Sequence, residues 1–424
     1  MSKQACLALS IFLSCTMLYG QSTTFGGSIG RIIEDCTSGV KNCCSVSTTP
    51  TAIYNANIQG SNLINGASIN ATQFSSGSYS VTLNTTGGLV TISASAGTQY
   101  VGVTSFDIAR ISQHRQFIKL FECPLTRIAA DVDNDGKITV TDEDIIRQFV
   151  LTVTTSLPVP PWRFVPKFYV KPTPNHPDQK FLEDFWNNTY ANTNGVEYPF
   201  NAVLKHNGKF YSYNGASSWM TKLESIPVEQ QPNICWSTYN YDFFGVASGD
   251  TNYSGSPANV PFAPGSEQSI TFDRVIAAQN NLRSADERYE VKIVAVAPED
   301  VHGYQLGIKF DEKVFQFEKV KPEKELQKQT ERNFGALPRQ TEKGELRVVW
   351  TNDYSVSKQG ILANQEFEVF SFNLKAKSNG KKLEESIQID EKILSAEFFG
   401  LDSLIANDKV KFVLKTRLLR PDEE

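Results

Sequence analysis

The stretch Asp131-Val132-Asp133-Asn134-Asp135-Gly136-Lys137-Ile138-Thr139-Val140-Thr141-Asp142 decides how the rest of the chain is interpreted. Oxygen donors recur along it: the side chains of Asp131, Asp133, Asp135, Thr139 and Asp142, and the backbone carbonyl of Lys137. A hard cation such as Ca²⁺ takes six to eight oxygens, and a loop of this length supplies them at positions 1, 3, 5, 7, 9 and 12. Gly136 permits the sharp bend, and Ile138 can anchor the loop to a core. The stretch therefore predicts a calcium site, with a solvated acidic turn as the alternative.

The last position of this loop carries further information. An EF-hand ends in Glu, whereas this loop ends in Asp142. An apolar helix follows directly, with Ile145, Ile146, Phe149, Val150 and Leu151. This combination resembles the type I dockerin repeat, which consists of two loop–helix units. The segment 102–114 resembles the first unit, and Trp162-Arg163-Phe164-Val165 and Gly249-Asp250-Thr251-Asn252 resemble segments that accompany the module in secreted proteins of Bacteroidetes type.

The first unit departs from the pattern. If Asp107 closes a contiguous loop, positions 1, 3 and 5 become Ala96, Thr98 and Tyr100, and none of them is a carboxylate. We therefore expect this loop to bind calcium poorly or not at all. Asp250 and Asn252 could ligate a second cation, although their motif is cut short at Tyr253.

The resemblance also implies which residues of the module contact a partner. In dockerins the exposed side of the helices binds a cohesin, and the two residues before the closing Asp matter for recognition. These positions are Ser105 and Phe106 in the first unit, and Val140 and Thr141 in the second. The alternative is that Phe106 and Val140 are simply core residues. We expect the two helices to begin at N-cap pairs, Thr104 with Asp107 and Thr141 with Asp144.

Residues 1–20 have the pattern of a signal peptide. Lys3 precedes an apolar run from Ala5 to Leu18, and Gly20 is a plausible cleavage position. The run is too short to span a bilayer, so we expect no transmembrane segment and a secreted or cell-surface protein. Five cysteines remain after residue 20, an odd number for complete pairing. The net charge of −5 argues against a nucleic-acid partner.

The chain divides into further segments by composition. Residues 42–106 contain no Asp, Glu, Lys or Arg, and their alternating pieces predict a small, prealbumin-like β-sandwich over residues 21–95, with a disordered linker as the alternative. The calcium-binding module then covers residues 96–155. Residues 156–265 are rich in Pro and aromatic residues. Their aromatic side chains could stack on a polysaccharide or form a local core, namely Trp219, Trp236, Tyr239 and Tyr241.

Clean alternation of apolar and polar residues begins at about residue 266. It predicts half-buried strands at 289–296, 304–310, 346–350, 370–376 and 410–414. Strands of this kind separated by turns indicate a jelly-roll β-sandwich over residues 266–417. The order of the strands resembles a cohesin domain. The expected fold class is therefore multi-domain and mainly β, with a small α-helical dockerin-like module between two β-sandwiches.

Known catalytic motifs are missing from the sequence. The four histidines are isolated, and no nucleophile elbow, zinc-binding helix or phosphate loop is present; Glu183-Asp184 is a glycosidase candidate by residue type alone. We expect a non-catalytic, calcium-binding assembly protein. The resemblance implies that its module docks a cohesin-like domain, in trans or in cis, in the context of polysaccharide breakdown. The alternatives are a surface structural or adhesive protein with the module as a spacer, and a carbohydrate-binding protein.

Overall fold

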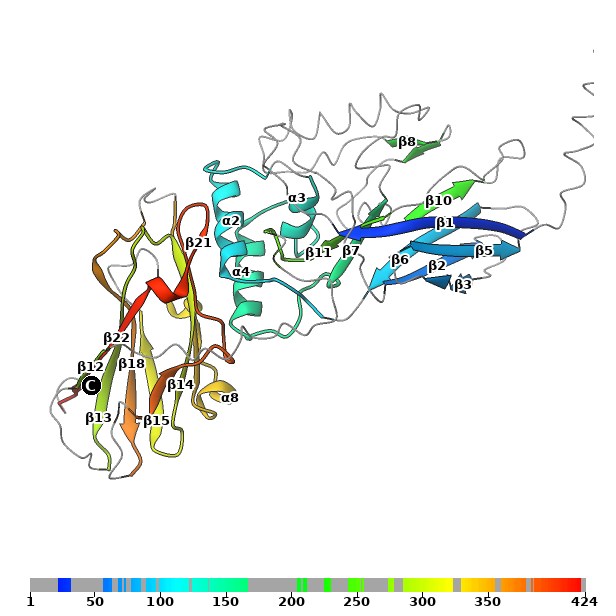
Figure 1. The fold of residues 1–424 in the computed structure, drawn as a ribbon. Coiled ribbons are helices and arrows are strands. Elements are labelled where there is room, and N and C mark those ends of the chain that lie inside the picture. Colours follow the sequence, from blue (N-terminus) through cyan, green and yellow to red (C-terminus); the bar gives the residue numbers. More distant parts are fainter. Residues whose placement is uncertain are drawn as a thin grey trace, which may run out of the picture.

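The structure is a computed structural model of the 424-residue chain (Figure 1). It describes residues 22–31, 56–62, 68–70, 72–73, 78–84, 89–96, 99–121, 124–135, 137–166, 204–206, 209–211, 225–229, 243–252, 254, 274–277, 285–322, 329–354, 360–378, 383 and 385–420. The signal sequence, the five later cysteines, Glu183-Asp184 and the aromatic residues proposed for sugar stacking lie outside these ranges. Among the described helices, none is long and apolar enough to cross a membrane.

The C-terminal part is a β-sandwich of two sheets. One sheet has the order β12-β22-β13-β18-β15; the other has β16-β17-β14-β20-β21, and β19 also pairs with β14. Its elements are β12 (Arg274–Ala277), β13 (Arg288–Val296), β14 (Gly303–Phe310), β15 (Phe315–Lys321), η2 (Glu331–Asn333), β16 (Phe334–Gly335), α8 (Pro338–Thr341), β17 (Glu345–Thr351), β18 (Glu366–Ala376), β19 (Ile387–Ile389), β20 (Glu397–Phe399), β21 (Leu404–Ile405), η3 (Asn407–Lys409) and β22 (Lys411–Leu418). Every strand predicted in this part of the sequence is present.

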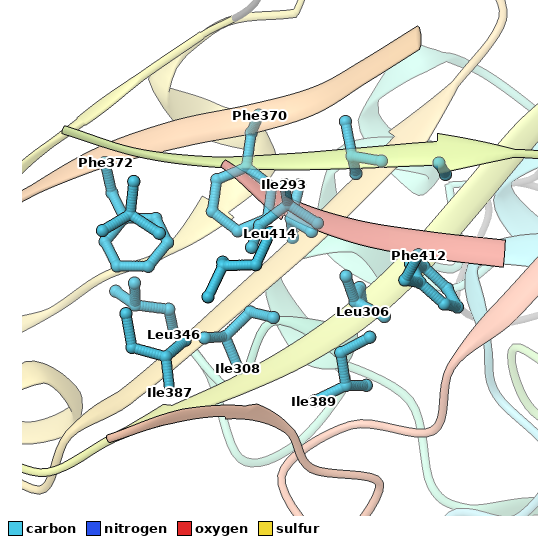
Figure 2. Close-up of a cluster of buried hydrophobic side chains, with 14 of the residues drawn as sticks. Ile293, Leu306, Ile308, Leu346, Phe370, Phe372, Ile387, Ile389, Phe412 and Leu414 are labelled. Carbon is cyan, nitrogen blue, oxygen red and sulfur yellow. The ribbon is translucent and has the colours of Figure 1, made fainter. Parts of the chain in front are cut away.

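Apolar side chains from the inner faces of both sheets form one core. Figure 2 shows Ile293, Phe370 and Leu414 of one sheet facing Leu306 and Ile308 of the other. Successive residues of a strand point to opposite faces of its sheet, so the alternation read from the sequence delivers one apolar row per strand to this core. The tight packing of the two rows fixes the register of the sandwich.

Strand β14 departs from the expected half-buried pattern, because its outer face is also covered. Gln305 points away from the core, yet it is only 1% exposed. A Cβ atom on Gly303 would lie 2.2 Å from the Phe399 ring, and one on Gly307 would lie 2.7 Å from the Asp390 carbonyl oxygen. The two glycines leave room for these neighbours, and the next layer of the molecule lies on this face.

That next layer is a helical module of α2 (Ser105–Arg115), α3 (Pro124–Ala130) and α4 (Val140–Val150). In Figure 1 α2 and α4 lie between the C-terminal sandwich and the N-terminal strands. The capping box of Thr104 and Asp107 begins α2, as predicted. The prediction for α4 was wrong: its capping box uses Thr139 and Asp142, two residues earlier than the predicted pair. The hydroxyl at position 9 and the carboxylate at position 12 of the loop therefore also start the helix.

The N-terminal strands form two sheets, ordered β4-β5-β1-β11-β7 and β10-β6-β2-β3. The members are β1 (Ser22–Arg31), β2 (Ala56–Asn62), β3 (Ser68–Asn70), β4 (Thr72–Gln73), β5 (Ser78–Asn84), β6 (Leu89–Ala96), β7 (Trp162–Pro166), β10 (Ser225–Glu229) and β11 (Phe243–Ala247); β8 (Leu204–His206) and β9 (Lys209–Tyr211) pair separately. Three strands that follow the helical module thus join strands that precede it. The predicted domain boundaries and the predicted N-terminal sandwich stay predictions.

The sandwich core generates a first prediction. Phe398 is fully buried and packs its ring 5.4 Å from Tyr304 and 5.5 Å from Phe412, between ring centroids. Because truncation leaves a cavity, Phe398→Ala should lower the free energy of unfolding of the sandwich by about 3–5 kcal/mol in urea denaturation. Leu404→Ala is the matched control; this side chain is 52% exposed, and its loss should cost no more than about 0.5 kcal/mol. Equal effects of the two substitutions would contradict this description of the core.

Candidate metal centre and docking face

The predicted calcium loop joins the end of α3 to the start of α4. The backbone N–H of Asp131 donates to the carbonyl of Arg127 at 3.0 Å, so the loop continues from the last turn of α3. Carboxylate oxygens of Asp131, Asp133 and Asp142 lie within 4.8 Å of one another. Three of the predicted ligands, two from the start of the loop and one from its end, therefore lie close together.

Asp142 closes the loop through its backbone contacts. Its Oδ1 accepts hydrogen bonds from the N–H groups of Val132 at 2.9 Å and Asp133 at 3.4 Å, and its Oδ2 accepts one from the Thr139 N–H at 2.8 Å. Asp133 Oδ1 accepts from the Asp135 N–H at 3.0 Å. These hydrogen bonds join the start of the loop to its end without a bound ion.

The other predicted ligands line the same loop. Asp135 is exposed, and its Oδ1 accepts a hydrogen bond from the Lys137 N–H at 2.8 Å. The Lys137 side chain is exposed, which suits a residue expected to bind through its carbonyl. The Thr139 hydroxyl lies 3.4 Å from Asp142 Oδ2. Val132 and Ile138 anchor the loop in the core of the module, at 0% and 1% exposure.

The electrostatics of the loop favour a cation. Burial, reinforced by neighbouring loop carboxylates, raises the pKa of Asp131 to about 7 and the pKa of Asp142 to about 6. The buried Arg163 partly opposes the shift at Asp131. Burial also raises the pKa of Asp133. Oxygen-only donors, three of them gathered carboxylates in a low-dielectric setting, fit Ca²⁺, whose charge would stabilise their ionised forms.

A second, similar arrangement surrounds Asp107 at the start of α2. Asp107 is fully buried, and its Oδ1 accepts hydrogen bonds from the Thr251 N–H at 2.7 Å and the Asn252 N–H at 3.3 Å. Its Oδ2 accepts one from the Thr104 N–H at 2.8 Å. Burial, and then the charge of Asp250, raises the pKa of Asp107. The backbone donors to Asp107 Oδ1 thus come from Thr251 and Asn252, far along the chain, whereas Oδ2 is held by Thr104 just before it.

The residues expected at the start of the first loop are used elsewhere. Ala96 ends β6, and Thr98 lies outside the described residues. The Tyr100 hydroxyl donates to the carbonyl of Val159 at 2.6 Å, and its ring packs on Phe149 with centroids 5.1 Å apart. Tyr100 therefore braces the segment after α4.

Helix α2 packs directly on the outer face of the C-terminal sandwich. Phe106 and Ala109 form a buried apolar cluster with Phe399 of β20, and the Phe106 and Phe399 rings lie 5.2 Å apart between centroids. The Ser105 N–H donates to Gln305 Oε1 at 2.9 Å. Both recognition positions of the first unit therefore contact the sandwich of the same chain.

Polar contacts continue along α2 and the loop after it. Gln113 Nε2 donates to the Tyr354 hydroxyl at 3.0 Å and to the Leu401 carbonyl at 2.8 Å. Lys119 Nζ pairs with Asp402 Oδ1 at 2.7 Å, with both side chains more than half exposed. The buried amide contacts specify the orientation, while an exposed ion pair adds little energy.

The end of α4 makes a second contact with the sandwich. Gln340 Nε2 donates to the Leu151 carbonyl at 2.9 Å and to the Thr152 hydroxyl at 2.7 Å. A Cβ atom on Gly335 would lie 2.6 Å from the Leu151 carbonyl oxygen, so this close approach requires glycine. Val349 of β17 joins the apolar core of the module. The module thus contacts the sandwich along α2 and again just after the end of α4.

The recognition positions of the second unit lie differently. Val140 is 52% exposed, and Thr141 is also exposed. Val140 lines an open groove of about 720 Å³ between the module and the sandwich, whose walls also include Arg115, Arg147 and Arg332. The alternative interpretation as core residues is therefore wrong for Val140. Phe106 is buried, but by the sandwich as well as by its own module.

Several docking residues could not be identified from the sequence, namely Gln113, Gln305, Gln340, Tyr354 and Phe399. Each comes from a different element, and no motif joins them. The one local signal was Gln305, a polar residue inside a strand of apolar residues and glycines. His114, one of the four isolated histidines, is fully buried, and its Nδ1 accepts a hydrogen bond from the Phe121 N–H at 2.8 Å.

Comparison with known proteins identifies the C-terminal part. Residues 278–397 match the family model described as the cohesin domain. The C-terminal sandwich is a cohesin-like domain. Cohesin domains are non-catalytic scaffolding domains that bind dockerin partners and occur in extracellular scaffoldins. The match agrees with the predicted cohesin-like sandwich, and a cohesin domain implies a role in protein–protein assembly for this part of the chain.

Solved structures with low similarity include cohesin complexes. A Coh-OlpA–Doc918 cohesin–dockerin complex from Clostridium thermocellum is 12% identical, covering 34% of this chain and 95% of that chain, with a TM-score of 0.25. The sixth cohesin of scaffoldin B from Acetivibrio cellulolyticus, in complex with a Cel5 dockerin mutant, is 14% identical, covering 34% and 93%, with a TM-score of 0.25. The comparison with curated proteins gave no match.

The pKa shifts in the loop generate a second prediction. An acid whose pKa is higher in the folded state than in the unfolded state stabilises the fold at low pH and loses that contribution as the pH rises through the folded value. In chelator, the helical module should therefore become less stable as the pH rises from about 4 to about 7. Urea unfolding of the full chain, followed by hydrogen exchange of the α4 peptide, measures this slope.

The matched variants are Asp131→Asn and Asp135→Asn. The first removes a buried charge and should flatten the slope, whereas the second changes an exposed position of the same loop and should preserve it. If the stability of the wild-type module in chelator does not depend on pH, the pKa values of these carboxyl groups are not raised in the folded state.

Proposed function

We propose that this chain is an exported, non-catalytic assembly protein whose dockerin-like calcium module docks onto its own cohesin-like domain. The observation that carries the proposal is the contact of α2 with β14 and β20, where Phe106 meets Phe399 and Ser105 meets Gln305. The resemblance assigns recognition to Ser105 and Phe106, and a cohesin-like domain is the partner class that a dockerin-like module requires. The contact therefore supports docking in cis.

Calcium has a defined part in this proposal. Asp131, Asp133, Asp135, Asp142, Thr139 and the Lys137 carbonyl would hold the ion. The helix that begins at this loop packs against α2 through a shared core that includes Ile108, Ile111 and Ile146. Calcium bound at the start of α4 would order that core and so hold the docking surface of α2 in place.

The environment of the docking contact explains why it should persist. Phe106 and Ala109 are 8% and 0% exposed, and Gln305 is 1% exposed. Separating the two parts would expose the aromatic pair and would leave the Gln305 side chain without its backbone donor. Because both partners belong to one chain, their effective concentration does not depend on the concentration of the protein.

A surface structural role is the second candidate, and one observation favours it. The module also contacts the N-terminal strands: the Gly249 N–H donates to the Ala129 carbonyl at 2.8 Å, and Arg163 Nη1 donates to the Asp131 carbonyl at 2.9 Å. A module fixed on both sides acts as a joint between two β-rich parts. Secretion, polysaccharide breakdown and binding of carbohydrate remain proposals from the sequence.

The two recognition pairs provide the test of the proposed function. Phe106→Ala should lower the stability of the docked state by about 3 kcal/mol, because it empties a buried contact. Thr141→Ala changes the corresponding exposed position of the second unit and should change it by no more than about 0.5 kcal/mol. Hydrogen exchange with mass spectrometry, in calcium and in chelator, measures the protection of the module and of the sandwich separately.

In wild type and in Thr141→Ala, calcium should slow exchange in the loop peptide and also in the peptides of β14 and β20. In Phe106→Ala, calcium should still protect the loop while its effect on the sandwich disappears. If calcium protects only the loop in the wild-type chain, the module is a spacer that does not dock.

A further inference from the structure

The Gly249-Asp250-Thr251-Asn252 stretch has a defined place in the fold. It follows β11 and lies against the start of α2. Its Asn252 is hydrogen-bonded to Asp107, although the two residues are 145 positions apart in the sequence. Asp250 and Thr251 are both 0% exposed. A polar turn buried this deeply against another chain segment needs a reason other than solvation.

The hydrogen bonds to the closing aspartate, and the turn bond to the side chain at position 3, recur in this segment as they occur in the loop at 131–142. Asp142 Oδ1 accepts from Val132 N–H and Asp133 N–H at 2.9 and 3.4 Å, and Asp107 Oδ1 accepts from Thr251 N–H and Asn252 N–H at 2.7 and 3.3 Å. The list of equivalent pairs is Asp131 with Asp250, Val132 with Thr251, Asp133 with Asn252, Asp135 with Ser254, Lys137 with Gly102, Ile138 with Val103, Thr139 with Thr104, and Asp142 with Asp107.

The remaining contacts follow the same equivalence. The Asp135 N–H donates to Asp133 Oδ1 at 3.0 Å, and the Ser254 N–H donates to Asn252 Oδ1 at 3.0 Å. The Thr139 and Thr104 N–H groups donate to the closing aspartates at 2.8 Å in both cases. One loop is continuous, and the other is built from residues 249–254 and 102–107.

The two halves of the split loop meet where calcium ligands would be needed. The Ser254 hydroxyl donates to the Gly102 carbonyl at 3.1 Å, so the position 5 side chain lies beside the position 7 carbonyl. Val103 packs against the core of the module, as Ile138 does in the continuous loop. The split loop therefore presents oxygen donors of the same kinds in the same order, with Asn and Ser replacing two aspartates.

The charges around the split loop supply an independent argument. Asp107 and Asp250 are two like-charged side chains at 0% exposure, held next to each other by separate chain segments. Glu397 of β20 places a third carboxyl beside Thr104, and its buried Oε2 has no hydrogen-bond partner among the described residues. Two buried, adjacent carboxyl groups with a third beside Thr104 indicate a cationic ligand, because buried charges are normally paired or coordinate metals.

We propose that residues 249–254 and 102–107 form a second calcium site, split between two distant segments, with ligands from Asp250, Asn252, Ser254, Gly102, Thr104 and Asp107. The inference rests on the proposed function, because it extends the calcium module from one site to two. The expectation that the first unit binds calcium poorly assumed a contiguous loop, and the split arrangement removes that assumption. An ion at this site would tie the segment after β11 to the start of α2, beside the docking residues Ser105 and Phe106.

Calcium stoichiometry of the full chain tests the split site. Isothermal titration calorimetry with Ca²⁺ as the ligand would be applied to the wild type, Asp131→Asn, Asp250→Asn, the double variant and the exposed control Asp408→Asn. We expect two ions per chain for the wild type and the control, one for each single loop variant and none for the double variant. Hydrogen exchange should assign the ion left in Asp131→Asn to the peptides around 102–107 and 249–254.

The other outcomes separate the two proposals. One ion in the wild type, lost in Asp131→Asn and retained in Asp250→Asn, would overturn the split site and leave the proposed function standing. No ion in any protein would overturn both. If Asp250→Asn does not fold, Ser254→Ala replaces it: a weakened affinity for one of two ions supports the split site, and unchanged binding of a single ion overturns it.

Discussion

The packing of α2 on the outer face of the cohesin-like sandwich is the contact on which the rest of the structure depends. It buries Phe106 against Phe399 and removes Gln305 from solvent. It also explains why the outer face of β14 is buried at Gln305. Without this contact, the sandwich would expose the Phe399 ring and the Gln305 side chain, and the module would expose the start of its first helix.

The closing aspartates of the two loops connect metal chemistry to helix formation. Asp107 and Asp142 each complete a capping box, so they satisfy orphan N–H groups at a helix start while gathering the loop around them. The same carboxylates are the ones that a cation would bind. The proposed ion sites and the starts of α2 and α4 therefore share single side chains, so the calcium proposal links ion binding to the placement of both helices.

Much of the fold followed from local sequence patterns, whereas the docking did not. The period-2 strands of the sandwich and the N-cap of α2 are local features, and they were predicted at the right residues. The calcium site at 131–142 was also read from a local motif and stays a prediction. The cap of α4 was misplaced by two residues because Thr139 serves both the loop and the helix. The split loop and the contacts of Gln113, Gln305 and Phe399 join segments far apart in the chain, and no periodicity or spacing encodes such pairs.

Zero-length carbodiimide cross-linking of an isotopic mixture tests the central claim most directly. Lys119 and Asp402 lie 2.7 Å apart, are exposed, and belong to the module and the sandwich respectively. Equal amounts of unlabelled and ¹⁵N-labelled chain would be mixed in calcium, cross-linked and digested, and the joined peptides would be weighed by mass spectrometry. Docking within one chain predicts a Lys119–Asp402 product whose two peptides always carry the same isotope. Mixed-isotope peptides, or no such product, would contradict it.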